Sequence, residues 1–383
     1  MGGGGMGNNM GGGMGGNNNG GKPQVPRFNV DGAPDDTISC LRFSPMGTPI
    51  NVLGCASWDG SIRAWQVNSN GNQISTSPIG LHNAGAPQLS LSIGQDGKVA
   101  HGGVCRKVMM YDLQSGASQQ IGTHDLAVSS VQYCTQNVPQ PLVMSGSWDG
   151  TVKIWDARQP TGNPVKVEQL GAPVFDIDAQ CSAPMATICM GRKVVLYNLS
   201  NLTIVKEHGV SSIIKFGNRC IRNAPDQSGF VVGSHEGRLG HHDLKAQTNA
   251  NASLPAVVFK AHNIEHSPTK FSMFQTNFCT YLKPPSGRVS DWLVVSGGGD
   301  GFMRIWRPSS KARVTEIDPI MAPAAPNAAP EAIPISAGDV SADMTMVATG
   351  HSYDWSMGKE NFNPQAQKLV TITPFQTSWA NPV

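Results

Sequence analysis

An internal repeat is the feature that most constrains how this chain can fold. The segments Ser57–Trp65 (SWDGSIRAW) and Ser147–Trp155 (SWDGTVKIW) are nearly identical and begin 90 residues apart. Repetition at a fixed period indicates an array of similar units, each too small to bury its own apolar face. A unit of about 45 residues that carries a Trp-Asp dipeptide is typical of the four-stranded blade of a WD-repeat β-propeller.

Weaker copies of the pattern occupy the rest of the chain. Each copy has an aromatic residue or a histidine at one common position, namely Trp65, Tyr111, Trp155, Tyr197, His242 and Trp306. These intervals are 46, 44, 42, 45 and 64 residues, so only the last holds a sizeable insertion, within residues 245–292. We expect a degenerate seventh copy with strands at 335–340, 344–350 and 369–373 and a fourth strand at 27–30. Using both chain ends in one blade would remove open sheet edges.

The composition agrees with many short strands joined by tight turns. Charged residues make up 14% of the chain, which contains 44 Gly and 27 Pro. The Asp-Gly pairs at 59–60, 149–150 and 300–301 suit tight hairpin turns, because Gly adopts positive φ without steric cost. We therefore predict an all-β, seven-bladed WD-repeat β-propeller over residues 27–375. A disordered Gly/Asn/Met-rich N-terminal tail is expected at 1–26, because it cannot bury enough apolar surface to fold, and a C-terminal tail at 376–383.

Histidines precede several blades in the slot where WD repeats carry a Gly-His dipeptide. In such repeats the histidine, the turn aspartate and the slot tryptophan join a hydrogen-bonded network. In the third blade these residues are His124, Asp149 and Trp155. Buried histidines and aspartates normally exist as hydrogen-bonded partners, so a structural role is favoured over a catalytic one.

The sequence argues against most forms of site chemistry. It contains no G-x-S-x-G, H-E-x-x-H or Walker pattern, so we expect no enzyme activity, no cofactor and no small-molecule substrate. Its eight cysteines include no C-x-x-C pair, and His241 and His242 would point to opposite faces of a strand, so no metal site is expected. The absence of a long apolar run predicts no membrane partner and no secretory signal.

Nucleic acid remains a candidate ligand, although the net charge of +2 is too small to indicate it. Short basic groups occur at Arg106, Lys107, Arg192, Lys193, Arg219 and Arg222. A further cluster, Arg307, Lys311 and Arg313, is a candidate face for RNA or an acidic partner. If such groups converge on one face they would contact phosphates, with strong salt dependence. If they do not, they are ordinary solvated charges, and the sequence leaves both alternatives open.

Several segments resemble one family of propellers. Residues His351–Gln365 (HSYDWSMGKENFNPQ) closely resemble the last blade of the mRNA export propellers of the nuclear pore, the RAE/GLE-type family. Ala33–Pro45 is similar to that family's opening strand, and Gly233–Arg238 and Phe259–His262 are similar to its fifth blade and the entry to its sixth. The resemblance runs from about Val30 to Thr373, and its most specific part is the Tyr-Asp-Trp-Ser segment. The chain departs from the family where an arginine replaces the aspartate after the sixth-blade tryptophan.

The resemblance implies a docking module and not a catalyst. Family members bind a short hairpin, the GLEBS motif, on a Gly-Leu-Phe-Gly-type nucleoporin. It therefore implies an mRNA export adaptor at the nuclear pore and nuclear envelope that shuttles to the cytoplasm, with mRNA or messenger ribonucleoprotein as a further candidate partner. The alternative is a mitotic checkpoint (kinetochore) propeller that binds GLEBS motifs of checkpoint kinases. That group lacks the Tyr-Asp-Trp-Ser-x-Gly segment, so the export function is favoured.

The resemblance also points to Arg238, beside Glu236, as the partner-binding site. The family carries an arginine in this slot, associated with acidic residues of the GLEBS hairpin. Other blades place Ser61, Thr151 or Phe302 there, so the repeat itself does not require a cation. An arginine can form two parallel hydrogen bonds to a carboxylate, which a lysine cannot. The alternative is an internal pair between Arg238 and Glu236 or a neighbouring blade.

Overall fold

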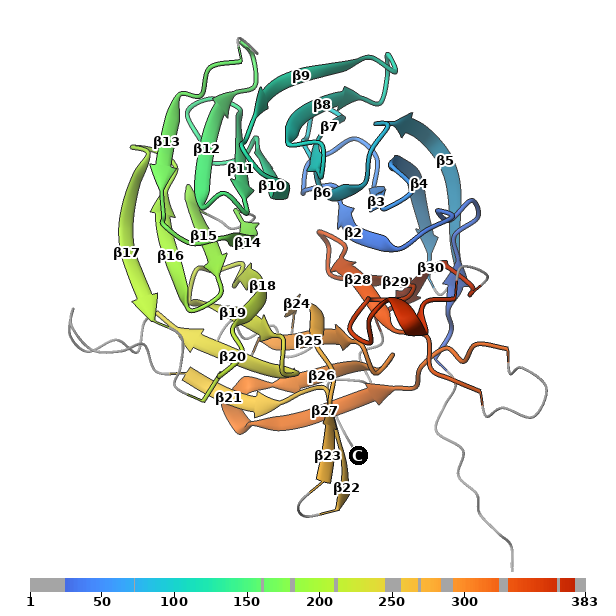
Figure 1. Cartoon of the computed structure of the whole chain (residues 1–383). Helices are drawn as coiled ribbons and strands as arrows, with labels where there is room; N and C mark the ends of the chain where they lie inside the picture. Colours follow the sequence, from blue (N-terminus) through green and yellow to red (C-terminus); the bar gives the residue numbers. More distant parts are fainter. Residues whose placement is uncertain are drawn as a thin grey trace, which may run out of the picture.

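The computed structural model describes residues 25–71, 73–159, 162–179, 183–209, 213–244, 256–267, 270–283, 292–323, 330–363 and 366–375. Seven four-stranded antiparallel sheets are arranged as blades around a central axis (Figure 1). This architecture confirms the predicted seven-bladed propeller. The segments 1–24 and 376–383, on which most of the two predicted tails falls, lie outside the described residues.

Each blade is built from four strands, and the first is nearest the axis. Blade one is β2 (Ile38–Phe43), β3 (Val52–Ser57), β4 (Ser61–Asn70) and β5 (Gln73–Asn83). Blade two is β6 (Gln88–Ile93), β7 (Lys98–Gly103), β8 (Lys107–Asp112) and β9 (Ser118–Thr123). Blade three is β10 (Val128–Cys134), β11 (Leu142–Ser147), β12 (Thr151–Asp156) and β13 (Lys166–Gln169). Blade four is β14 (Val174–Asp178), β15 (Met185–Met190), β16 (Lys193–Asn198) and β17 (Thr203–Gly209).

The remaining blades follow the same order. Blade five is β18 (Asn218–Asn223), β19 (Gly229–Ser234), β20 (Arg238–Asp243) and β21 (Ala256–Lys260). Blade six is β24 (Thr276–Leu282), β25 (Leu293–Gly298), β26 (Met303–Arg307) and β27 (Ala312–Ile317). Blade seven is β28 (Ile335–Val340), β29 (Met346–His351), β30 (Leu369–Pro374) and β1 (Phe28–Asn29). The predicted slot residues all lie on third strands of the first six blades and are buried.

Blade seven closes the ring with strands from both ends of the repeat region. β1 pairs antiparallel with β30, so that Phe28 lies opposite Ile372, and the backbone N–H of Val30 donates to the carbonyl of Val370 at 2.9 Å. The N-terminal strand of the described chain therefore belongs to the last blade, as the sequence predicted. This closure protects one edge of β30 by pairing.

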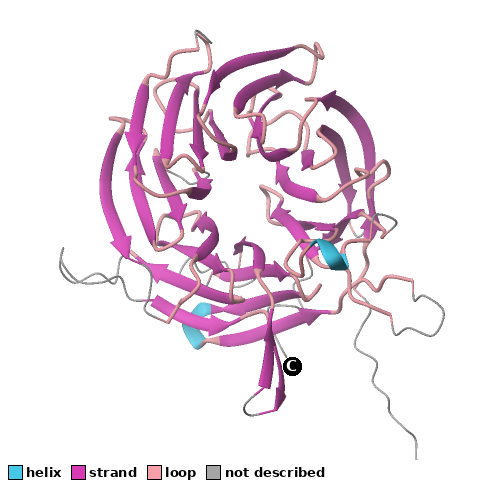
Figure 2. Cartoon of the chain, in the orientation of Figure 1, coloured by secondary structure: helices cyan, strands magenta, loops and turns pink. Residues whose placement is uncertain are grey.

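Elements outside the blades are few. A two-stranded hairpin, β22 (Asn263–Ser267) and β23 (Lys270–Met273), interrupts the connection between blades five and six and projects away from the ring (Figure 1). In the described part of the chain, the helical segments are two short 3-10 turns, η2 (Pro308–Ser310) and η3 (Lys359–Asn361) (Figure 2). No helix among the described residues has the length and apolar character needed to cross a membrane.

The apolar core is divided among the interfaces between blades. The buried hydrophobic residues form seven clusters, and each cluster joins two adjacent blades. Glycines on second strands allow the next blade to approach closely. A Cβ built on Gly146 would lie 2.5 Å from Val174 of blade four, and one on Gly350 would lie 2.7 Å from Ile38 of blade one. Larger side chains there would push neighbouring blades apart.

One end of the ring carries two kinds of loop, and we call it the top face. Because successive strands of a blade are antiparallel, the turn from second to third strand and the connection to the next blade lie at this same end. Turns of this kind contain the Gly60, Gly150 and Gly301 of the Asp-Gly pairs, all with positive φ. The opposite end, with the turns between third and fourth strands, is the bottom face.

The histidine of blade three anchors its top turn. His124 Nδ1 lies 3.3 Å from Asp149 Oδ2, and His124 Nε2 lies 2.8 Å from Ser145 Oγ. The same Ser145 oxygen accepts a hydrogen bond from Trp155 Nε1 at 2.8 Å. Burial lowers the pKa of His124 to about 4, so the imidazole is neutral at pH 7 and the contact with Asp149 is a hydrogen bond, not an ion pair.

Blade six contains the same arrangement. His262 Nδ1 lies 2.8 Å from Asp300 Oδ1, and His262 Nε2 lies 3.0 Å from Ser296 Oγ. Trp306 Nε1 donates to that Ser296 oxygen at 3.3 Å. In both blades a serine, Ser145 or Ser296, joins the histidine to the tryptophan. The repeat pattern did not point to these serines.

We predict that Asp149→Ala lowers the free energy of unfolding by about 1.5–3 kcal/mol, because the buried His124 ring and the backbone of the turn lose their acceptor. Asp149 accepts hydrogen bonds from the backbone N–H groups of Asp125 and Thr151, at 2.9 and 2.8 Å. Urea unfolding of both proteins provides the measurement. Asp125→Ala, at an exposed loop side chain, is the control and should change the free energy by less than about 0.5 kcal/mol. Unchanged stability combined with lost partner binding would instead make Asp149 a binding residue.

Candidate binding face

Large aromatic side chains are exposed on the top face. Trp58 and Trp148 occupy equivalent turn positions and are 38% and 42% exposed, and Phe216, between blades four and five, is 66% exposed. The Asp-Gly turns themselves do not require an aromatic residue at the position before them. Clustered exposed apolar side chains on a soluble fold mark interaction surfaces. In the sequence these tryptophans served only to identify the repeat. An aromatic residue that the turn does not need was nevertheless a sign that these positions could bind a partner.

The Tyr-Asp-Trp-Ser segment forms part of this face. The Trp355 ring packs against Phe362, Tyr353 and Trp58, with centroid separations of 4.7, 5.5 and 6.5 Å. Its indole Nε1 donates a hydrogen bond to Thr37 Oγ1 at 3.1 Å. Trp355 adopts φ of 60°, a left-handed conformation that is unfavourable for a bulky residue, so these contacts must offset the strain.

The aspartate of the same segment faces the ring interior. Asp354 Oδ2 accepts hydrogen bonds from Gln275 Nε2 and Asn277 Nδ2, both at 3.1 Å. Gln275 immediately precedes β24, and Asn277 lies on that first strand of blade six. Since Trp355 contacts blade one, this segment of blade seven connects both neighbouring blades. The most specific part of the family resemblance is therefore a connector as well as a surface.

A central cavity of about 540 Å³ is lined at the top by Trp58, Trp148, Phe175, Arg219 and Trp355. The rings and the guanidinium come from loops or strand ends of different blades. Aromatic and arginine side chains are the groups most enriched at protein interfaces. This combination of residues suits a partner that presents both apolar and acidic side chains.

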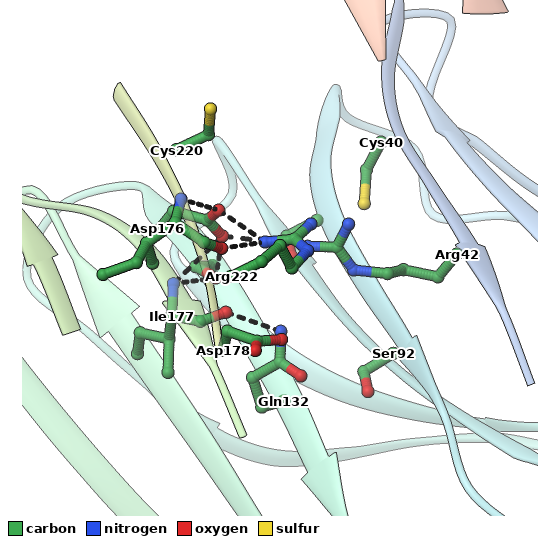
Figure 3. Close-up of polar contacts among 12 residues, drawn as sticks. Cys40, Arg42, Ser92, Gln132, Asp176, Ile177, Asp178, Cys220 and Arg222 are labelled. Carbon is green, nitrogen blue, oxygen red and sulfur yellow. Dashed lines mark hydrogen bonds and ion pairs between the residues drawn. The ribbon is translucent and has the colours of Figure 1, made fainter. Parts of the chain in front are cut away.

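Deeper in the cavity, an ion cluster connects distant blades (Figure 3). Asp176 of β14 accepts a hydrogen bond from Arg222 of β18, Nη1 to Oδ2, at 2.8 Å. Arg42 of β2 approaches the same carboxylate, with 3.8 Å between Nη2 and Oδ1. Figure 3 shows Arg42 reaching this pair from the opposite side. Both arginine side chains are buried, so neither guanidinium is available as a surface cation.

The predicted partner-binding pair lies on the top face. Arg238 begins β20 directly after the Glu236-Gly237 turn, and its Nε lies 3.7 Å from Glu236 Oε2. This separation exceeds a hydrogen bond, and the buried Nε atom has no hydrogen-bond partner among the described residues. Glu236 is itself buried and accepts a hydrogen bond from the backbone N–H of Lys215 at 2.6 Å. The internal pair that the sequence left as an alternative is present, but only as a loose ion pair.

The structure separates the predicted basic cluster from this pair. Arg307, Lys311 and Arg313 lie around the turn between β26 and β27, which is at the bottom face. Arg313 Nη1 donates to Glu316 Oε2 at 2.6 Å, so an acidic side chain already neutralises part of the cluster. The basic residues at top-face loops or at the strand ends beside them include Arg106, Arg192, Lys215, Arg219 and Arg238. Sequence proximity did not reveal this grouping, because its members come from blades two, four and five and from the connection between blades four and five.

Asp178, at the end of β14, lines a second cavity at the bottom face. Burial raises its pKa to about 7, against about 3.9 in an unfolded chain. The folded protein therefore favours the protonated carboxyl. The stability that Asp178 contributes is fully present below about pH 4 and is lost as the pH rises through about 7, because the buried carboxyl must then ionise. Its Oδ2 accepts a hydrogen bond from the backbone N–H of Asn223 at 2.8 Å, which an amide oxygen could also accept.

We predict that Asp178→Asn stabilises the protein relative to wild type by about 2.5 kcal/mol more at about pH 8 than at about pH 5, because each pH unit between the two pKa values is worth about 1.4 kcal/mol. Urea unfolding of both proteins at both pH values is the measurement. Asp125→Asn, at an exposed position, is the control and should show no such gain. Parallel pH profiles for wild type and Asp178→Asn would contradict the assignment.

Comparison with known proteins places the chain in a family. The model of the WD domain, G-beta repeat, matches residues 25–66 and 118–156. The chain is 30% identical over 344 residues to the WD40 repeat protein poxJ of Penicillium oxalicum, covering 89% of this chain and 91% of that protein. It is 29% identical over 343 residues to the Poly(A)+ RNA export protein of Schizosaccharomyces pombe, covering 89% and 88%.

Two further similarities are more distant or narrower. The mitotic checkpoint protein bub-3 of Caenorhabditis elegans is 28% identical over 293 residues, covering 76% of this chain and 80% of that protein. A solved structure described as U3-55K superposes with a TM-score of 0.69 at 16% identity, covering 92% of this chain and 98% of that one, which shows a shared fold alone. The matches to poxJ and to the Poly(A)+ RNA export protein show that the chain belongs to the WD-repeat propeller family that includes the RAE/GLE-type mRNA export factors.

Proposed function

We propose that this protein is a non-enzymatic adaptor for mRNA export that docks at the nuclear pore by binding a GLEBS-type hairpin of a nucleoporin on its top face. The observation that carries the proposal is the exposed aromatic and basic surface at the mouth of the central cavity. The export-protein relatives, matched over about nine-tenths of the chain, support the cellular role. Such a role places the protein in the nucleus and at the nuclear envelope, with passage to the cytoplasm.

The composition of the top face favours an amphipathic, acidic ligand. Trp58, Trp148 and Trp355 offer rigid apolar area with little entropy to lose on binding. Arg219 lines the same cavity as these rings, and Arg238 adds positive charge at the top of blade five. A hairpin with apolar and carboxylate side chains would match both properties, whereas a neutral or basic peptide would match only one.

Arg238 has the chemistry to fix such a hairpin in place. Its side chain is 25% exposed, and it forms a 3.7 Å ion pair with the carboxylate of Glu236. A carboxylate from a partner could replace this loose contact with two direct hydrogen bonds. The register pairs Arg238 with Lys260, whose Nζ lies 5.3 Å from the centre of the Phe271 ring in the projecting hairpin. The surrounding surface therefore combines cations and apolar rings.

We predict that Arg238→Ala weakens binding of a GLEBS peptide by about 2–5 kcal/mol, the scale for breaking a desolvated charge pair. Arg238→Lys should recover only part of the loss, because lysine cannot form the bidentate contact. Isothermal titration calorimetry gives the affinities, and thermal melts should show little change in stability. The control is Arg158→Ala, at an exposed arginine paired with Asp156 at the bottom end of blade three.

Equal peptide affinities for wild type and Arg238→Ala would remove this residue from the binding site. A large loss of stability would instead make Arg238 a structural residue. Affinity purification from nuclear extract, with and without RNase, separates the export role from the checkpoint alternative suggested by the bub-3 relative. Recovery of a pore nucleoporin supports the proposal, whereas recovery of checkpoint kinases alone would overturn it.

RNA is a second candidate ligand, proposed for the bottom-face hairpin of blade six. The hairpin brings Arg307, Lys311 and Arg313 together, and Arg313 lies opposite Trp306 in the strand register. Trp306 in turn packs against Phe259, with ring centroids 4.8 Å apart. Because no base-reading motif is present, binding there would depend on phosphate contacts and tolerate different sequences.

We predict that replacing Arg307, Lys311 and Arg313 with Glu weakens binding to single-stranded RNA at least about tenfold and makes the salt dependence shallower, because each lost phosphate contact removes about 0.7 from the slope. Fluorescence anisotropy at several salt concentrations is the measurement. A charge-matched control replaces Arg106, Arg192 and Lys215 of the top face. Unchanged RNA affinity in the first variant would exclude the cluster, and a larger loss in the control would move RNA to the top face.

A further inference from the structure

Two cysteines face each other between neighbouring blades. Cys220 lies on β18, the first strand of blade five, and Cys279 lies on β24, the first strand of blade six. Their Sγ atoms are 3.6 Å apart, and both side chains are buried. All the cysteines in the described part of the chain are free thiols, so this pair is reduced in the structure.

The surroundings allow the two sulfur atoms to approach further. Cys220 Sγ donates weakly to the carbonyl of Thr276 at 3.7 Å, and Cys279 Sγ to the carbonyl of Val231 at 3.8 Å. Gly233 leaves space beside the two sulfur atoms because it has no side chain. A Cβ at this position would lie only 2.7 Å from Cys220 Sγ. A disulfide needs an S–S distance of about 2.05 Å, so the sulfurs must close by about 1.5 Å, a movement of the order that side-chain rotation supplies.

The central cavity provides a route for a small oxidant. Cys220 is among the residues that line it, whereas Cys279 is 1% exposed. A volume of about 540 Å³ greatly exceeds that of a peroxide molecule, which is not much larger than a water of about 30 Å³. Burial raises the pKa of the Cys279 thiol well above its usual range, which disfavours its thiolate as the first nucleophile. The position of Cys220 on the cavity wall and the disfavoured thiolate of Cys279 both favour Cys220 as the thiol that reacts first with the oxidant.

We propose that Cys220 and Cys279 form a peroxide-sensitive thiol pair that closes to a disulfide between blades five and six. The Cys220 thiolate attacks one oxygen of hydrogen peroxide, which breaks the O–O bond, forms a sulfenic acid and, after proton uptake, releases water. The Cys279 sulfur then attacks the Cys220 sulfur, forming the S–S bond and expelling a second water. Overall, two thiols lose two electrons and two protons, and one peroxide becomes two waters.

The disulfide would act directly on the cavity. It would draw β18 against β24, and the neighbours of Cys220 along β18 include Arg219 and Arg222, which also line the cavity. It would also link two blades that the chain otherwise joins through its largest insertion, which contains β22 and β23. A covalent link of this kind restricts the unfolded chain and stabilises the folded ring. This inference is independent of the partner proposed above.

The test uses the full chain, reduced with dithiothreitol and then exposed to hydrogen peroxide. We expect a mass loss of about 2 Da, the disappearance of two alkylatable thiols and a crosslinked peptide that contains Cys220 and Cys279. The melting temperature should rise by several degrees, and dithiothreitol should reverse every change. Cys220→Ser and Cys279→Ser should each abolish the crosslink, and the control Cys55→Ser, at a buried cysteine of blade one, should retain it.

Other outcomes would overturn the proposal. Wild-type protein that keeps both thiols, or that accumulates oxygen on Cys220 without forming the crosslink, contradicts it. Persistence of the mass loss in Cys279→Ser would assign the disulfide to other cysteines. Peptide mapping of the wild-type protein decides the matter by itself if either serine variant fails to fold.

Discussion

Packing of one blade against the next is the interaction on which the rest of this structure depends. No blade encloses a core of its own, because each buried cluster draws residues from two adjacent sheets. Stability therefore requires a closed circle, in which the last interface is formed by blades seven and one. β1 contributes to this closure by pairing with β30 in the last blade, while Ile38 packs against the backbone of Gly350 across the interface. A ring that failed to close would expose apolar faces and unpaired strand edges.

Polar contacts add specificity to this apolar ring. Asp176 receives Arg222 from the adjacent blade and Arg42 from a distant one, and Asp354 receives amide donors from blade six. Buried charges gain little net stability, because desolvation offsets their attraction, but leaving one of them unpaired is costly. Such contacts favour the arrangement in which every partner is present. The neutral hydrogen-bonded His124 acts similarly within blade three, where it joins a top-face turn to the interior.

A rigid ring can bind a partner because its strands and its loops have different roles. The strands and their interfaces carry the fold, so the top-face loops can present side chains that the repeat does not require. Trp58 and Trp148 are examples, since their turns are already fixed by the following Asp-Gly pairs. Trp355 combines both tasks, because its strained backbone is held by contacts with blade one while its ring remains partly exposed.

The sequence by itself determined the repeat and the seven blades, because these depend on local periodicity and turn chemistry. Strand-like segments at both ends of the repeat region predicted the closing strand, and the resemblance of the Tyr-Asp-Trp-Ser segment indicated the family. It also brought His124, Asp149 and Trp155 together, since their spacing reflects one blade. Only the tertiary structure decided which residues from different blades meet. It placed Arg238 and the Arg307–Arg313 cluster at opposite faces, and it brought Cys220 within 3.6 Å of Cys279 across 59 positions of sequence. The physical reason is that closure of the ring sets these distances, and no local pattern records them.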